Sequence, residues 1–204
     1  HGRGADRHDL KGVAQVLPEG SVLVTPQAPH PGAAWGYGGG WAWYRYVAED
    51  RVIADTLLDS LARLDHFIEA LPDLLEDRLG ITPGPVTLGG FSQGGTTSLA
   101  YALTHPGKVH GVSVFSGFLV DAPESVIIQG PALDDTPVFW GHGTDDPAIP
   151  FSLGERGRTR LRVEGVDLTT FDYPMGHGIS PSELNDWMNW MRSRALLHVD
   201  GVGL

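Results

Sequence analysis

Short apolar runs alternate with longer segments of helical periodicity along this chain. The apolar runs are rich in β-branched residues and are bounded by Gly and Pro, which is typical of buried strands. The runs cover residues 21–25, 85–88, 112–115, 137–140 and 168–173, and the helical segments cover about 49–71, 96–103 and 184–191. Because strands separated by helices pair in parallel, this order predicts an α/β fold with a mostly parallel central sheet and helices on both faces. No linker or repeat divides the chain, so residues 1–204 are expected to form a single domain.

Residues 90–94 read Gly-Phe-Ser-Gln-Gly, which is a G-x-S-x-G pattern. They lie between the apolar run at 85–88 and the helical segment at 96–103. In a strand–turn–helix setting this pattern forms a nucleophile elbow, a sharp turn that exposes a serine hydroxyl to a base and a substrate. A glycine-rich turn with a capping serine is the alternative. The setting favours Ser92 as a nucleophile.

A serine hydroxyl needs a base within hydrogen-bond reach, and the base needs an orienting acid. Among nine histidines, His177 stands on a glycine-flanked loop that follows the run at 168–173. The sequence from Ser180 to Glu183 then reads as a capping box that begins the last helix. Catalytic side chains of open α/β sheets gather at the carboxyl ends of strands. His177 is therefore the predicted base, with a solvent-exposed loop histidine as the alternative.

Two adjacent carboxylates, Asp145 and Asp146, follow the run at 137–140. Asp146 precedes a proline, which restricts it to an extended backbone and helps to aim its side chain. Asp145 is the competing choice for the acid, and spacing alone does not separate the two. The order of serine, aspartate and histidine along the chain is that of the α/β-hydrolase triad.

Four blocks of sequence carry a specific resemblance. They are His-Gly-Arg-Gly-Ala at 1–5, Gly-Gly-Phe-Ser-Gln-Gly-Gly at 89–95, His-Gly-Thr-Asp-Asp-Pro-Ala-Ile-Pro at 142–150, and Met-Gly-His at 175–177. Together they resemble the phospholipase/carboxylesterase family of α/β-hydrolases, which includes bacterial carboxylesterases and acyl-protein thioesterases. The resemblance implies the α/β-hydrolase fold and a triad of Ser92, Asp146 and His177, since the family's acid immediately precedes the proline of the third block.

The same resemblance implies an oxyanion hole made of two backbone N–H groups. By position these belong to Arg3, in the first block, and Gln93, directly after the nucleophile. Two preorganised donors stabilise the charge that develops during acyl transfer. The family usually has an apolar residue where Arg3 stands, so a cation is expected at the mouth of the pocket.

The family also has strands before the first block, and the strand that leads into it is internal to the sheet. An unpaired interior edge exposes backbone N–H and C=O groups. We therefore expect the 1–204 domain to lack N-terminal strands, and the functional molecule to have at least one further strand upstream of His1, beside residues 22–24 and 86–88.

An aromatic, glycine-rich loop at residues 26–46 is the predicted wall of the substrate pocket. The alternative is that its aromatic side chains fill the core. The predicted substrate-binding residues on this loop and on a second wall are Trp35, Tyr37, Trp41, Phe118 and Leu119. Residues 117–136 are too few for a separate lid domain, so a site that is open or covered by loops is expected.

Composition restricts the partners. The formal net charge of −11 disfavours nucleic acids and anionic membrane surfaces. The absence of cysteine excludes disulfides, thiolate zinc sites and a cysteine nucleophile. No apolar run approaches the roughly 20 residues that span a bilayer. Adjacent carboxylates at 134–135 and 145–146 are interpreted as solvated turn residues, so neither a metal nor a cofactor is expected. A cytoplasmic location is expected, and a homodimer is compatible with the sequence.

These observations predict a serine esterase that acts on short-to-medium acyl esters through an acyl-enzyme. An acyl thioesterase or a lysophospholipase with the same triad is the alternative within this chemistry. A non-catalytic binding protein on a hydrolase scaffold is the alternative from another class, and it would not react at Ser92 with an organophosphonate.

Overall fold

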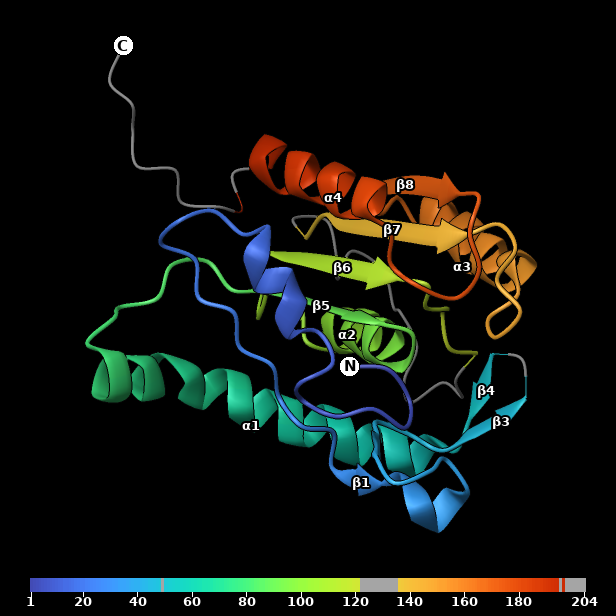
Figure 1. The fold of residues 1–204 in the computed structure, drawn as a ribbon, viewed down its shortest axis with the longest axis horizontal. Helices are drawn as coiled ribbons and strands as arrows, with labels where there is room; N and C mark the ends of the chain where they lie inside the picture. Colours follow the sequence, from blue (N-terminus) through green and yellow to red (C-terminus); the bar gives the residue numbers. More distant parts are fainter. Residues whose placement is uncertain (49, 122–135, 195, 197–204) are drawn as a thin grey trace.

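A four-stranded parallel sheet forms the centre of the computed structural model, which describes residues 1–48, 50–121, 136–194 and 196 (Figure 1). Its strands follow the order β5-β6-β7-β8, so each strand pairs with the next strand along the chain. They are Thr87–Phe91, Gly111–Phe115, Val138–Gly143 and Leu168–Tyr173. All three pairings are parallel, which places the carboxyl ends of the four strands at one edge of the sheet.

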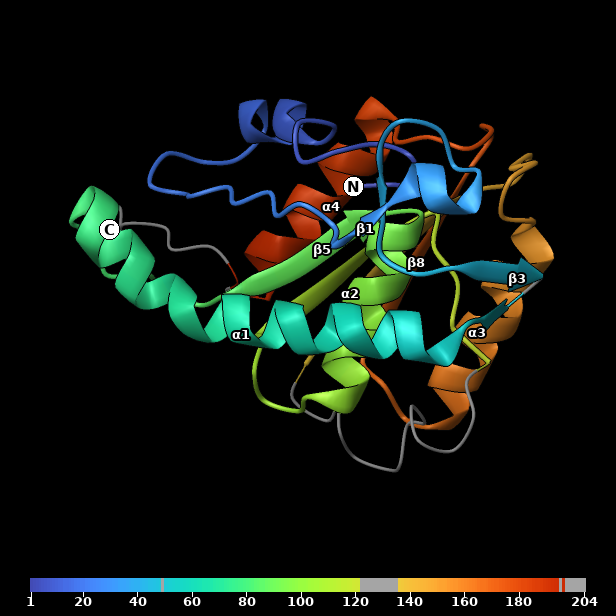
Figure 2. The ribbon, with the colours of Figure 1, turned by 90° about the horizontal axis from the view of Figure 1, so that it is seen from below.

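Helices cover both faces of this sheet. The four α-helices are α1 (Ala54–Leu79), α2 (Gln93–Thr104), α3 (Phe151–Val163) and α4 (Pro181–Ser193). Helices α1, α2 and α3 pack in one hydrophobic cluster, while α4 packs in a second cluster with the segment around the short helix η1 (Lys11–Gln15). Figure 2 shows α1 and α2 on one side of the strands and α4 on the other. The predicted α/β fold with helices on both faces is confirmed.

The alternation of side chains along each strand explains the two clusters. Successive side chains of a strand point to opposite faces of the sheet. Val114 of β6 and Trp140 of β7 therefore join the cluster of α1, α2 and α3, whereas Phe115 and Phe139 join the cluster of α4. The indole N–H of Trp187 in α4 donates to the hydroxyl of Ser113, which satisfies both buried polar groups.

Short extended pieces precede α1 and form two antiparallel pairs. Strand β1 (His30–Pro31) pairs with β2 (Trp41–Ala42), and β3 (Tyr46–Ala48) pairs with β4 (Arg51–Val52). The short helix η2 (Gly32–Trp35) lies between β1 and β2. The aromatic loop of the sequence is thus folded into small hairpins beside the sheet.

The predicted strand at 21–25 is wrong. These residues are irregular and join no strand pair, and Val22 is 42% exposed. A strand requires a hydrogen-bonded neighbour. Residues 21–25 instead line a cavity of about 520 Å³, which β5 also lines.

Two helices differ from what the sequence predicts. Helix α1 continues past Pro72 to Leu79 and ends at Gly80, whose φ of 64° provides the left-handed C-terminal cap. Helix α3 was not predicted, because Gly154 and Gly157 interrupt its pattern of helix-forming residues. Both glycines are required by close packing, since a Cβ at Gly154 would lie 2.9 Å from His142 Nδ1.

In the described ranges, no separate lid domain stands over the sheet. Residues 122–135 lie outside these ranges. They include most of the segment that was predicted to be too short for a lid and the carboxylate pair at 134–135. No helix in the described residues is both long enough and apolar enough to cross a bilayer.

Candidate active site

Ser92 lies on a sharp turn between β5 and α2. Its φ of 54° and ψ of −118° are a conformation that non-glycine residues rarely adopt. The glycines around it permit the turn, because a Cβ at Gly90 would lie 2.8 Å from the Cα of Gly94. Local strain of this kind persists only where the surroundings enforce it, and it is common at functional sites. The sequence from Gly90 to Gly94 thus adopts the strand–turn–helix geometry of a nucleophile elbow.

His177 and Asp146 are joined across the carboxyl ends of β7 and β8. The Nδ1 atom of His177 lies 2.7 Å from Oδ2 of Asp146. The other oxygen of Asp146 accepts hydrogen bonds from the backbone N–H groups of Ala148 (2.8 Å) and Ile149 (2.9 Å). The Asp146 side chain is fully buried, whereas Asp145 is exposed and contacts Thr144. A carboxylate on Nδ1 selects the imidazole tautomer that leaves Nε2 free to accept a proton.

The loop that carries His177 lies against the elbow. The imidazole ring is 4.6 Å from the ring of Phe91, the residue before Ser92. The capping box of α4 holds the far end of this loop, since Ser180 Oγ accepts from the N–H of Glu183 at 3.1 Å. Within the described residues, the Ser92 hydroxyl forms no hydrogen bond with His177. Such bonds are often long before substrate binds.

The first residues of the chain pack directly on the elbow. A Cβ at Gly2 would lie 3.6 Å from the Cβ of Ser92, and a Cβ at Gly94 would lie 2.8 Å from the carbonyl oxygen of His1. The Nδ1 atom of His1 donates to the carbonyl of Gly2 at 2.9 Å, while Nε2 accepts from the N–H of Ala28 at 3.1 Å. His1 is therefore a neutral imidazole whose two nitrogens are both engaged.

This arrangement leaves two backbone donors unused beside Ser92. The N–H of Arg3 belongs to the same peptide unit as the carbonyl of Gly2, and it points away from that carbonyl. The N–H of Gln93 is at the first position of α2, where a helix offers unsatisfied donors. Neither N–H donates a hydrogen bond to any other group in the described part of the chain. Both are available to a bound oxyanion.

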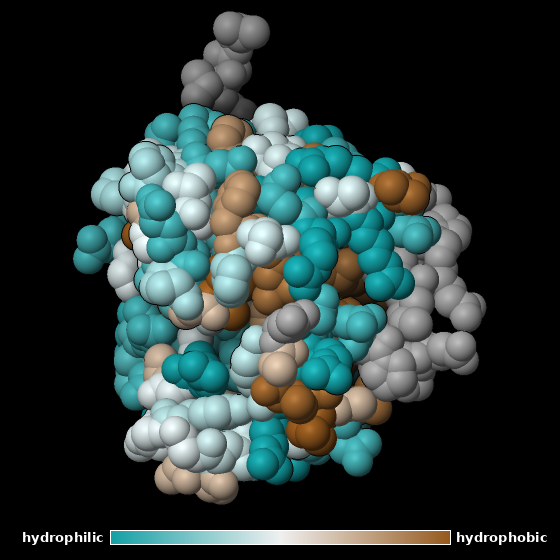
Figure 3. Space-filling view, turned by 90° about the vertical axis from the view of Figure 1, so that its right-hand side faces the viewer, coloured by the Kyte–Doolittle hydropathy of each residue, from teal (hydrophilic) through white to brown (hydrophobic). Residues whose placement is uncertain are grey.

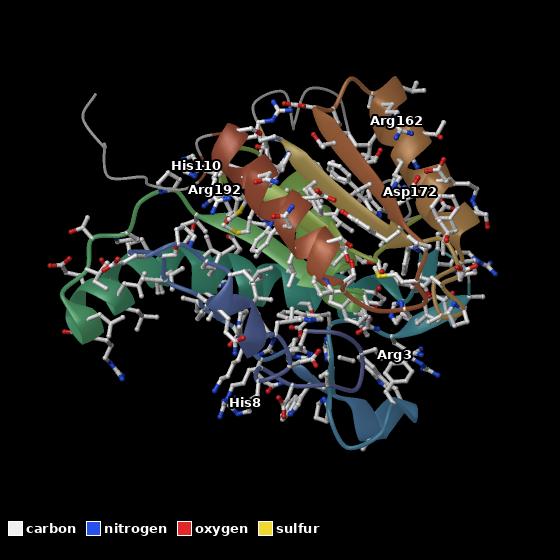
Figure 4. All side chains as sticks on the ribbon, turned by 45° about the horizontal axis from the view of Figure 1, so that its top comes forward. Arg3, His8, His110, Arg162, Asp172 and Arg192 are labelled. Atoms are coloured by element: carbon white, nitrogen blue, oxygen red, sulfur yellow. The ribbon has the colours of Figure 1, made fainter. Side chains whose placement is uncertain are left out.

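The Arg3 side chain lies over the aromatic ring of Tyr37. Its guanidinium carbon lies 4.8 Å above the centre of the Tyr37 ring. No carboxylate in residues 1–48, 50–121, 136–194 and 196 lies within ion-pair distance of it. Figure 4 shows Arg3 on the N-terminal segment, far from Asp172 and Arg162 at the opposite side of the sheet.

The five residues predicted to bind substrate lie in two different environments. Trp35, Tyr37 and Trp41 are partly exposed on the folded aromatic loop, and the Tyr37 hydroxyl accepts from the N–H of Tyr46 at 2.8 Å. Phe118 is 1% exposed and packs in the core against Tyr44, and Leu119 packs against α3 beside Gly157. Their roles stay predictions.

The cavity of about 520 Å³ is not lined by Ser92, Asp146 or His177. We therefore do not assign it to the substrate. The surface at the carboxyl ends of the strands is the better candidate. Figure 3 looks onto the side toward which β6 and β7 run, where apolar side chains form separate patches among hydrophilic ones.

The sequence did not predict the burial of several charged or titratable side chains. His142 is fully buried, its Nε2 donates to the carbonyl of Ile149 at 2.9 Å, and burial lowers its pKa. Burial also raises the pKa of the Glu183 carboxyl to about 7. The guanidinium of Arg158 is fully buried and donates to the carbonyls of Trp140 and Phe171. Sequence patterns do not predict the burial of these residues, because it depends on contacts between distant elements.

Over the ranges that the structure describes, no group of three His, Asp or Glu side chains could hold a metal ion.

Comparisons with known proteins find relatives named as carboxylesterases and as acyl-protein thioesterases. The Arabidopsis thaliana protein named probable carboxylesterase SOBER1-like is 37% identical over 119 residues, which are 56% of this chain and 44% of that protein. Acyl-protein thioesterase 1 of Cryptococcus neoformans is 34% identical over 149 residues, which are 66% of this chain and 60% of that protein. The chain thus spans about half the length of these curated relatives.

The fold is shared with solved α/β-hydrolases. The crystal structure of a point variant of Arabidopsis thaliana SOBER1 matches with a TM-score of 0.79 and 25% identity, covering 96% of this chain and 97% of that chain. The sequence profile of the phospholipase/carboxylesterase family matches residues 1–194. The chain therefore belongs to the phospholipase/carboxylesterase family of α/β-hydrolases, as its four sequence blocks predict.

Proposed function

We propose that this protein hydrolyses carboxylic esters through an acyl-enzyme on Ser92, with His177 as the base and Asp146 as the orienting acid. The observation that carries the proposal is the 2.7 Å contact between Asp146 and His177 beside the strained turn at Ser92. Relatives named carboxylesterase support the reaction type.

In the first half of the reaction, Nε2 of His177 takes the proton from Ser92 Oγ, which attacks the ester carbonyl. The N–H groups of Arg3 and Gln93 stabilise the negative charge on the carbonyl oxygen. Asp146 stabilises the imidazolium without taking its proton. His177 then gives the proton to the departing alcohol, and Ser92 remains acylated.

In the second half, water replaces the alcohol. His177 takes a proton from water, the hydroxide attacks the acyl carbonyl, and the carboxylic acid leaves as Ser92 regains its proton. The charge on the oxygen is stabilised by the same two amides in both halves. No further group is needed to balance the reaction.

Short-to-medium acyl esters are the proposed substrates. The partly exposed aromatic side chains of Trp35, Tyr37 and Trp41 offer apolar area for an acyl or alcohol group. Thioesters are the second candidate, because a relative is named acyl-protein thioesterase 1 and the same acyl-enzyme forms from either substrate. A cytoplasmic location and a homodimer stay predictions.

A series of chromogenic esters from acetate to dodecanoate tests this function, with matched thioesters as the second arm. We expect hydrolysis by the unaltered protein, with the highest kcat/KM among the shorter chains, and a loss of about 10⁴-fold or more in Ser92→Ala. A protein that binds these esters but hydrolyses none of them would instead be a binding protein on a hydrolase scaffold.

A further inference from the structure

Trp43 contacts both of the chain segments that carry the proposed oxyanion donors. Its indole N–H donates to the carbonyl of His1 at 3.0 Å, and its backbone N–H donates to Oε1 of Gln93 at 3.0 Å. The residue is 6% exposed, so water does not compete for these bonds. One side chain and its own backbone thus connect the segment of Arg3 with the first residue of α2.

The side chain of Gln93 is fully occupied by this connection. Its Oε1 accepts from the N–H of Trp43, and its Nε2 donates to the carbonyl of Tyr44 at 2.9 Å. Gln93 is 5% exposed, and its side-chain amide binds the backbone of two consecutive residues rather than substrate. Its backbone N–H remains free at the start of α2. The side chain fixes where that N–H points.

On the other side, Trp43 binds the His1–Gly2 peptide, one unit before the peptide that carries the Arg3 N–H. The carbonyl of His1 is bound by the indole, and the carbonyl of Gly2 is bound by the His1 ring. The His1 and Trp43 rings also lie 5.5 Å apart. Because a peptide unit is planar, fixing the Gly2 carbonyl sets the direction of the Arg3 N–H.

Trp43 is itself held by the helical layer. The hydroxyl of Ser60 in α1 donates to the carbonyl of Trp43, and both residues are buried. The connection between the two donors is therefore anchored to a long helix rather than to a free loop. Rigid support of this kind keeps catalytic groups within the small tolerance that they require.

We propose that Trp43 is a positioning residue that sets the separation and direction of the Arg3 and Gln93 amides. The inference rests on the proposed function, because it assigns these amides to the oxyanion. Trp43 acts through His1 and Gln93 and does not touch the reacting atoms. Its loss leaves both donors present but misplaced, which affects the transition state more than the bound substrate.

Trp190 provides a matched control for a purely structural role. It is also buried, at 4% exposure, and it packs in the cluster of α4, but its indole nitrogen has no hydrogen-bond partner in the described part of the chain. Replacing either tryptophan by phenylalanine removes similar apolar area. Only Trp43→Phe also removes a hydrogen bond that orients a proposed donor.

The experiment compares Trp43→Phe, Trp190→Phe and the unaltered protein in kcat, KM, Tm and inhibition by an alkyl boronic acid. The boronic acid forms a tetrahedral adduct on serine whose oxygen occupies the oxyanion hole. For Trp43→Phe we expect kcat to fall about 10-fold to 100-fold, KM to change little, and boronate inhibition to weaken by a similar factor. For Trp190→Phe we expect a lower Tm with kcat and boronate inhibition nearly unchanged.

Gln93→Met is the second variant, because it removes both side-chain bonds and keeps the backbone donor. Gln93→Met should reproduce the effects of Trp43→Phe on kcat and on boronate inhibition. The loss of kcat in the double variant of Trp43→Phe and Gln93→Met should be much smaller than the product of the two single losses. If Trp43→Phe does not fold, the single variant Gln93→Met decides the question. Equal losses of kcat in Trp43→Phe and Trp190→Phe, or normal boronate inhibition in Gln93→Met, would overturn the inference. Ester hydrolysis by the unaltered protein would in that case still support the proposed function. Absence of hydrolysis by the unaltered protein would overturn the function itself.

Discussion

Asp146 engages His177 with one carboxylate oxygen and the backbone of its own turn with the other. The two backbone N–H groups fix the carboxylate, and the fixed carboxylate in turn fixes the imidazole. Asp145, the neighbouring candidate from the sequence, is exposed and lacks such support. The contrast between two adjacent aspartates gives a direct test of the proposed acid.

Asp146→Asn should lower kcat by about 10⁴-fold, because an amide favours the wrong tautomer of His177. Asp145→Asn changes the same charge one residue away and is expected to lower kcat less than about 10-fold. Steady-state kinetics on one chromogenic ester measures both. The opposite ranking would move the acid to Asp145.

Ser92→Ala and His177→Ala should each lower kcat by about 10⁴-fold to 10⁶-fold, because the proton acceptor and the nucleophile act as one unit. The double variant should therefore be about as slow as either single variant. Kinetics on the three variants measures the coupling. If the two single losses multiplied, Ser92 and His177 would act independently.

Gly90→Ala should abolish activity and lower Tm, because its new Cβ would lie 2.8 Å from the Cα of Gly94, which is backbone that cannot move aside cheaply. Gly84→Ala is the matched control, since a Cβ at Gly84 would meet no atom within 4 Å. Thermal unfolding and ester kinetics compare the pair. A fully active Gly90→Ala variant would contradict the tight-turn account of the elbow.

Glu183 predicts a pH dependence of stability with a definite sign. Its folded pKa is raised from the ordinary 4.5 to about 7, so between these values the folded protein holds a proton that the unfolded chain has lost. The contribution of Glu183 to the free energy of unfolding is therefore greatest below the unfolded pKa. This contribution falls by about 3 kcal/mol as the pH rises through 7.

Urea unfolding of the unaltered protein and Glu183→Gln at about pH 5 and about pH 8 isolates this effect. Glutamine stays neutral, so the stability of Glu183→Gln relative to the unaltered protein should be higher at the higher pH than at the lower pH. Glu164→Gln, at an exposed position just after α3, is the control and should not change the pH slope. Equal slopes for all three proteins would show that Glu183 ionises normally.

Local patterns in the sequence predict most of the sheet and the candidate triad. The run at 168–173 coincides with β8, and the capping box from Ser180 to Glu183 begins α4 where its residues indicate. These elements depend on neighbours in sequence, so a short window contains their signals. The elbow at Ser92 is of the same kind, because glycine spacing and the flanking strand and helix specify it locally.

Features that depend on distant contacts could not be predicted. Residues 21–25 have the composition of a strand, but they pair with no described strand, and β5 pairs only with β6 in this part of the chain. The side-chain bonds of Gln93 to the backbone of Trp43 and Tyr44 connect residues about fifty positions apart, and no local pattern encodes them.

Labelling with an organophosphonate, followed by intact-mass and peptide mass spectrometry, tests the acyl-enzyme most directly. The account predicts one adduct per chain on Ser92, loss of ester hydrolysis in proportion to labelling, and no adduct in Ser92→Ala. It also predicts that His177→Ala labels at least about 10³-fold more slowly, since the hydroxyl then lacks its base. Continued hydrolysis by a fully labelled protein, or an adduct on another residue that tracks the loss of activity, would contradict it.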